Sequence, residues 1–242
     1  MFKKLSLFAF VLCLIIPSAF MFCGCGTGKT TINVSSAAEL REKLTTADAN
    51  SVIVLQNDIT LSQDDATQRF VATKKVTLDL NGKTIQAKVG EGYDGTNNSL
   101  FSNLTYIFLV DQGGDLTVTG NGTVDGKTGD VFAFNVKNGG KLTIQNGTFA
   151  GSATAVQVDK GQATINGGSF SVLPAENTDD ERYLLNLIDA NGADGSATIT
   201  VYGGEFEKFN PSDNLAENPK KNFVAEGYKV VQSGTKYIVQ KA

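Results

Sequence analysis

The residues with the most suggestive chemistry lie near the N-terminus, in the run Cys23-Gly-Cys-Gly-Thr-Gly-Lys-Thr-Thr31. Gly28-Lys29-Thr30 matches the second half of a phosphate-binding loop, where backbone N–H groups cradle phosphate between a strand and a helix. That motif needs a glycine five residues before Gly28, where this chain has Cys23, and a buried strand before the loop. The spacing and the position therefore argue against a nucleotide site.

Composition excludes several other kinds of chemistry. The chain has no histidine, which removes histidine general bases, Ser-His triads and His-ligated zinc. Its three cysteines, Cys13, Cys23 and Cys25, all lie in or beside the first apolar segment, so we expect no internal disulfide and no thiol chemistry beyond it. The net charge of −4 argues against nucleic-acid binding, because that requires a basic surface.

The first 24 residues have the layout of an export signal. Lys3 and Lys4 precede an almost wholly apolar stretch from Leu5 to Phe22, and small residues follow. We therefore predict a signal peptide over residues 1–24. An apolar stretch of this length could also span a bilayer as an uncleaved anchor, and an ordinary secreted protein is the other alternative.

The end of this segment resembles a bacterial lipoprotein signal, in which a small residue precedes the cysteine that carries lipid. Gly24-Cys25 fits that ending, although Phe22 stands where such signals usually have leucine. The resemblance implies lipidation at Cys25, and residues 25–31 then form a flexible tether between membrane and domain. The protein would be exported and anchored on the cell surface or in the periplasm.

A repeat organises the rest of the chain. Each copy reads apolar-Thr-apolar, then a turn ending in glycine, then a short strand, and an alternating strand precedes each of the last four copies. The copies begin at Val76, Leu116, Leu142, Ala163 and Ala197. A single copy, with its few short strands, cannot bury its apolar face alone. We therefore expect successive copies to stack as coils, at ordinary strand spacing, and to share one continuous core.

Asparagine recurs at the turn that precedes the last strand of a copy. Asn81, Asn121 and Asn146 each stand before the turn glycine, and Asn and Gly tolerate the left-handed backbone that a sharp corner needs. We predict that these three side chains form a structural ladder that satisfies turn amides.

With these coils, the chain resembles the single-stranded right-handed parallel β-helix proteins of the pectin-lyase-like superfamily. "VTLDLNGKTI" and "LTVTGNGTVDGKTG" are similar to early coils of such proteins. The resemblance implies an all-β solenoid over residues 32–206. It says little about activity, because fold does not fix function.

Both ends of such a stack need covers, because open coils expose apolar side chains and unpaired strand edges. Residues 35–46, "SSAAELREKLTT", predict a short N-terminal cap helix with Ser35 or Ser36 as its N-cap. Residues 207–242 predict a polar connection and then a capping β-hairpin, with two alternating strands around a Ser-Gly-Thr turn.

The enzymes of the resembled superfamily provide motifs to test. Asn177-Thr-Asp-Asp180 imitates part of a polygalacturonase site, but the histidine motif and the R-I-K motif of those enzymes are absent. Pectate lyases use calcium with an arginine base, and Arg69 and Arg182 each lie near an acidic pair. Asp79 and Asp125 lie on or beside strands, where surface solubility is the simpler role. We assign no catalytic residue, no metal ligand and no cofactor, with calcium left as a possibility.

The insertion "VGEGYDGTNNSLFSNLTY" holds the candidate ligand-binding residues. Loops that leave a rigid scaffold commonly carry function. Tyrosine faces can stack on sugar rings and amides can bond to hydroxyls, so we select Tyr93, Asn97, Asn98 and Tyr106. The alternative is that Tyr106 folds back as core, since large rings near strand starts are usually buried.

These observations favour a non-catalytic, surface-exposed β-helix lipoprotein that serves in adhesion or glycan binding, with a membrane contact through its lipid. A polysaccharide lyase or glycoside hydrolase of the same fold is the first alternative. A structural or phage-derived fibre component is the second.

Overall fold

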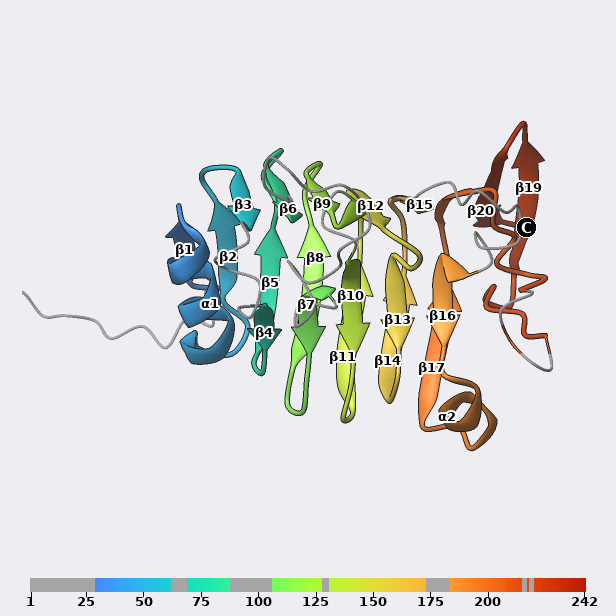
Figure 1. Ribbon diagram of the computed structural model, residues 1–242, viewed down its shortest axis with the longest axis horizontal. Helices are drawn as coiled ribbons and strands as arrows, with labels where there is room; N and C mark the ends of the chain where they lie inside the picture. The colour runs from blue at the N-terminus through green and yellow to red at the C-terminus, as the bar shows by residue number, and fades with distance from the viewer. Residues whose placement is uncertain are drawn as a thin grey trace, which may run out of the picture.

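The computed structural model describes residues 29–61, 69–87, 106–127, 131–172, 183–214, 217 and 220–242. Most of them lie in strands, which form three sheets. Figure 1 shows the strands side by side along the long axis, from β1 at one end to β19 and β20 at the other. The chain visits the three sheets in a fixed order, and we call one such circuit a coil.

Sheet A has seven parallel strands, and each strand between its two ends pairs with the strands of the coils before and after it. Its strands, in spatial order, are β1 (Thr31–Val34), β2 (Val52–Leu55), β5 (Lys75–Asp79), β8 (Asp115–Thr119), β11 (Gly140–Ile144), β14 (Gly161–Ile165) and β17 (Ala197–Val201). Threonines form one outward row across it, because Thr77, Thr117, Thr143, Thr164 and Thr200 pair in succession.

Sheet B has eight strands and contains the chain's only antiparallel pairs among the described strands. They are β3 (Ile59–Leu61), β6 (Thr84–Ala87), β9 (Thr123–Asp125), β12 (Thr148–Gly151), β15 (Ser169–Val172), β18 (Gly204–Glu207), β20 (Lys236–Lys241) and β19 (Tyr228–Ser233). Sheet C has five parallel strands: β4 (Phe70–Ala72), β7 (Tyr106–Val110), β10 (Phe132–Val136), β13 (Val156–Val158) and β16 (Leu185–Leu187). The predicted order of strands within a coil and the stacking of like strands are both present.

The core runs through all the coils as one cluster of buried side chains. Period-two alternation puts one residue in and the next out, as in β8, where Leu116 and Val118 are fully buried. Phenylalanines stack inside it with centroid separations of 5.1–5.5 Å, first on sheet C and then on sheet B. The stack consists of Phe70, Phe108, Phe134, Phe149, Phe170 and Phe206.

The two ends are covered as the sequence predicts, with additions. Helix α1 (Ala37–Thr46) begins after the N-cap Ser36 and buries Leu40 and Leu44. Strands β19 and β20 form the hairpin, and β20 pairs with β18. A second helix, α2 (Asp189–Ala193), was not predicted, and neither was β1. Strand β1 begins at Thr31, inside the expected tether, because that residue pairs with Val52.

The alignment of the last coil needs correction. The repeat places Ala197 opposite Ala163, but Ala163 pairs with Ile199 and Ile165 pairs with Val201. A shift of two residues keeps every side chain on its face, so the apolar-Thr-apolar pattern fits both registers. The turns decide between them, because Ser169 pairs with Glu205 and Phe170 with Phe206 in the following strands.

Candidate functional site

The exposed aromatic residue of the described chain lies at the corner where sheet A leads into sheet B. Tyr202 follows β17 directly, and 40% of its surface is exposed. Its ring meets the ring of Tyr228 edge to face, with centroids 5.4 Å apart and planes at 85°. The backbone N–H of Tyr202 donates to Ile165 O at 2.7 Å, which fixes the corner. An exposed ring with a fixed backbone is a stacking surface that loses little entropy on binding.

Amide side chains occupy the same corner position in the preceding coils. Gln145 and Asn166 donate their backbone N–H to Val118 O and Ile144 O, as Tyr202 does one coil later. Asn166 Nδ2 donates to Gln145 Oε1 at 3.3 Å, and in the neighbouring column Asn146 Nδ2 donates to Asn121 Oδ1 at 3.3 Å. We call the set Asn121, Gln145, Asn146, Asn166, Tyr202 and Tyr228 the corner surface.

The hydrogen bonds of the corner surface leave bonding capacity for a ligand. A primary amide has two donor hydrogens and an oxygen that accepts two bonds. The bond between Asn166 and Gln145 uses one donor of the first amide and one acceptor position of the second. Thr119 Oγ1 occupies a further acceptor position, on Asn146 Oδ1 at 3.2 Å. Gln145, Asn166 and Tyr202 follow one another in successive coils, a pattern suited to hydroxyl-rich ligands with an apolar face.

A shallow hollow of about 200 Å³ lies beyond the corner on the outer face of sheet B. Its lining combines hydroxyls, carboxylates and one ammonium: Thr148, Ser169, Phe170, Ser171, Glu205, Glu207 and Lys236. Lys236 Nζ lies 2.8 Å from Glu205 Oε2, and this hydrogen bond, with the negative charge of Glu205, raises the pKa of Lys236. Lys236 lies opposite Glu207 in the pairing of β18 with β20.

The same coils supply the corner surface and the hollow. Only Gly147 separates Asn146 from Thr148, and a glycine pair separates Asn166 from Ser169. The last coil repeats this arrangement, with Gly203 and Gly204 between Tyr202 and Glu205. Gly147 and Gly204 have φ values of 119° and 113°, a region that residues with a Cβ rarely adopt. Glycine therefore allows polar or aromatic side chains to stand on both sides of a very tight turn.

Four of the predicted site residues lie outside the described part of the chain: Cys25, Tyr93, Asn97 and Asn98. The fifth, Tyr106, begins β7 and is only 6% exposed. Its hydroxyl accepts a hydrogen bond from Arg69, and the Arg69 guanidinium lies 4.8 Å from the ring centre. Tyr106 is thus a buried strand residue, and its ring is not offered to a ligand.

The three asparagines predicted as a ladder behave differently from one another. Asn146 and Asn121 are joined by the side-chain hydrogen bond described above, which Asn146 donates. Asn81 instead donates from Nδ2 to Leu55 O at 2.9 Å, in the coil before it. Asn81 alone of the three has a positive φ, 49°, whereas Gly120 and Gly147 take the left-handed positions in the other two coils.

The charged residues considered for catalysis have structural contacts. Asp79 Oδ1 accepts from Asn81 N at 2.8 Å, and Asp125 Oδ1 accepts from Lys127 N at 2.8 Å, so both support turns. Arg69, a candidate arginine base, donates to the hydroxyl of Tyr106 and lies over its ring. The residues 177–182 of the acidic run lie outside the described ranges.

No group of three or more metal-ligating side chains occurs among the residues that the structure describes. Within the same residues, no helix is both long and apolar enough to cross a membrane. Comparison with known proteins found no matching family model, curated protein or solved structure.

The sequence contained a signal for the corner surface that the repeat alignment obscured. Gln145 and Asn166 each follow an apolar-Thr-apolar triplet, and Tyr202 follows the triplet Ile199-Thr-Val201. An alignment on the turn glycines places Tyr202 opposite Asn166, as the structure does. An alignment on the first triplet, Ala197-Thr-Ile, instead moves Tyr202 away from the position of Asn166 and Gln145. Exposure of the ring could not be inferred either way.

Proposed function

We propose that this chain is a non-catalytic, surface-displayed lipoprotein that binds glycans through the corner surface. The observation that carries the proposal is the exposed Tyr202 ring, braced by Tyr228, at the end of a row of amide side chains. Sugar rings present an apolar face for stacking and a rim of hydroxyls for hydrogen bonds. The corner surface offers the complementary groups in two neighbouring columns, one of which continues to Tyr202.

The fold that we propose is a right-handed parallel β-helix similar to the pectin-lyase-like proteins. Support comes from three sheets in which parallel strands of successive coils pair in order. A rigid scaffold of this kind suits recognition, because the binding groups do not have to be ordered when the ligand arrives.

Display at the cell surface or in the periplasm rests on the signal-like N-terminus and on lipid at Cys25. Stable membrane attachment requires more than one acyl chain, since a single chain holds a protein only marginally. In this arrangement the membrane holds the N-terminus and the coils extend away from it.

A binding role is favoured over a catalytic one by the contacts of the charged residues. Asp79 and Asp125 are engaged with turn amides, and Glu205 is engaged with Lys236. A glycosidase of the usual kind needs two carboxyl groups with separate roles, one protonated and one ionised, set by different environments.

The test is binding of the full chain, in detergent solution, to an array of polysaccharides and oligosaccharides. Tyr202→Ala removes the stacking surface, and we expect affinity to fall at least about tenfold, in keeping with an aromatic contact of about 1.5 kcal/mol. Tyr202→Phe retains the ring and should keep most of the affinity.

Val231→Ala is the matched control, because Val231 is exposed to a similar extent, 39%, and lies on β19. Equal loss in the Tyr202 and Val231 variants would argue against a site at the corner. Absence of binding to every glycan would reject the proposed function, and release of reducing or unsaturated sugar would instead identify an enzyme.

A further inference from the structure

The segment that follows β18 closes the last coil by hydrogen bonding to strand edges. Val201 N donates to Phe223 O at 2.8 Å, and Ala225 N donates to Val201 O at 2.9 Å, which covers the edge of sheet A at β17. The hairpin covers the edge of sheet B through β20. Sheet C ends at β16, and its edge receives a side chain instead of a strand.

That side chain is Glu217, which is only 3% exposed. Its Oε1 accepts a hydrogen bond from the backbone N–H of Leu187 in β16 at 2.9 Å. Because β16 is the last strand of sheet C, none of the described strands pairs with this amide. Glu217 therefore attaches the C-terminal segment to the edge of sheet C.

The second oxygen of Glu217 is buried and has no hydrogen-bond partner among the described residues. A buried carboxylate with an unsatisfied oxygen is costly, whereas the neutral acid is much less so. The contact with Leu187 survives protonation, because a neutral carboxyl group retains an acceptor oxygen. Protonation thus removes the cost and keeps the attachment.

Two charged groups act on Glu217 from the elements around it. Asp189 belongs to α2, and Lys221 follows Glu217 in the same segment. Strand β16 consists of Leu185, Asn186 and Leu187 and presents no titratable group. Burial raises the pKa of Glu217 above its usual 4.5. The negative charge of Asp189 adds to the shift, and so does a side-chain hydrogen bond with Asp189, which needs a proton on the carboxyl pair. The Leu187 amide and Lys221 oppose the shift.

A metal ion is a poorer explanation for this cluster than a proton. Among the described residues, this cluster holds only two carboxyl groups, and calcium requires six to eight oxygen ligands. The Lys221 ammonium also lies against α2, where a Cβ added to Gly192 would be 2.8 Å from Nζ. A cationic side chain beside the carboxyl pair repels a second cation.

We propose that Glu217 is a proton-operated latch, which holds the C-terminal segment firmly on the edge of sheet C in acid and loosens it as the pH rises. The sign follows from the raised pKa. The closed state binds the proton of Glu217 more tightly than the open state does. The stabilisation of the closed state is therefore fully present below pH 4.5 and is lost as the pH rises through the higher pKa that Glu217 has in the folded protein. This is the reverse of ordinary acid denaturation.

The experiment is an NMR titration of the full chain in detergent micelles, from about pH 4 to about pH 9. The Glu217 carboxyl carbon should titrate above 4.5. The opening of the Leu187 amide, measured by hydrogen exchange and corrected for its intrinsic rate, should increase over the same interval. Each unit of raised pKa corresponds to a roughly tenfold loss in the closed-to-open ratio at high pH.

Three substitutions test the cause. Glu217→Gln keeps an acceptor oxygen but cannot ionise, so the Leu187 amide should remain protected at every pH. Asp189→Asn should move the midpoint of Glu217 down, and Lys221→Gln should move it up. The amide of Gln145, which donates to Val118 O in an interior coil, serves as the internal control and should not follow the transition.

The latch is rejected if Glu217 titrates at or below 4.5, or if Glu217→Gln retains the pH dependence of the native chain. It is also rejected if both neighbouring substitutions leave the midpoint unchanged. Should Glu217→Gln fail to fold, the titrations of the Asp189 and Lys221 variants still decide, because they shift the midpoint in opposite directions.

Discussion

At the scale of the residue, the stacked phenylalanines are the largest fully buried side chains among the described residues. Phe134 lies at the point where the stack passes from sheet C to sheet B, with its ring 5.2 Å from Phe108 and 5.5 Å from Phe149. Phe134→Ala should lower the free energy of unfolding by about 3–5 kcal/mol, because it leaves a cavity between two rings. Chemical denaturation measures this.

Phe132 on the same strand provides the comparison, because it is half-buried. Phe132→Ala should cost clearly less than Phe134→Ala. Equal losses would mean that the stack contributes nothing beyond ordinary burial.

Gly140 shows at the same scale why the coils need glycine between sheets C and A. A Cβ at this position would lie 2.4 Å from Val110 O in the preceding coil, which is too close for any side chain. Gly140→Ala should therefore destabilise the protein by several kcal/mol, as overpacking against rigid backbone does, or prevent folding. Gly139→Ala, at a position with open space but a φ of 85°, should cost only the backbone strain of about 1–2 kcal/mol. Thermal unfolding of the two variants distinguishes these outcomes, and a milder effect at Gly140 would contradict the close approach.

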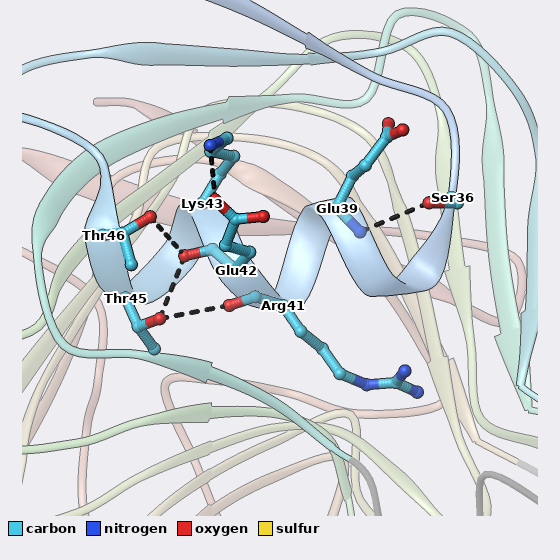
Figure 2. A network of polar contacts seen from close by, with 7 residues as sticks. All are labelled: Ser36, Glu39, Arg41, Glu42, Lys43, Thr45 and Thr46. Atoms are coloured by element: carbon cyan, nitrogen blue, oxygen red, sulfur yellow. Dashed lines mark hydrogen bonds and ion pairs between the residues drawn. The ribbon is translucent and has the colours of Figure 1, made fainter.

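At the scale of the element, helix α1 is specified locally. Glu39 N donates to Ser36 Oγ at 3.2 Å (Figure 2). Glu39 Oε2 also accepts from Ser35 N at 2.7 Å. These bonds satisfy backbone groups that a helix start leaves unpaired. Ser36→Ala should cost about 1 kcal/mol in unfolding free energy.

Ser35→Ala is the matched control for that cap. Its backbone N–H keeps the bond to Glu39, so stability should change little. A loss as large in Ser35→Ala as in Ser36→Ala would show that the cap bond is not the cause.

Helix α2 has the opposite origin. Its sequence, DANGA, has no side-chain cap and contains Asn191 and Gly192, which are poor helix formers. Asn191 Nδ2 donates to Asp159 O at 2.5 Å, so a contact with the preceding coil holds this helix in place. Such a contact joins residues that are far apart in the chain, so the local sequence does not predict it.

At the scale of the whole molecule, stacking creates edges that the chain must cover. The hairpin pairs with β18 through four residues and places Val239 in the core. Removal of residues 228–242 would leave an unpaired strand edge beside Phe206. We expect the shortened chain to associate as its concentration rises, because exposed edges pair with other chains. Analytical ultracentrifugation of the full and shortened chains checks this, and a shortened chain that stays monomeric would mean that the edge is otherwise protected.

The sequence by itself determined the coil, its cap helix and its terminal hairpin. The period-two pattern predicts which side chains face inward, and glycine indicates the corners. Ser36 and Glu39 together predict where the helix begins. These features depend on residues close together in the chain, so local physics is enough to read them. The parallel pairing of successive coils follows from the repeat alone.

Only the tertiary structure decided which of two aromatic residues is exposed on the surface. Tyr106 and Tyr202 both adjoin strands, yet the first is buried against Arg69 and the second is exposed beside Tyr228. Their environments depend on which residues lie opposite in neighbouring coils. A two-residue shift in the last coil does not change which side chains face inward and which face outward. Only packing and turn geometry select the register that places Tyr202 beside Asn166 of the preceding coil.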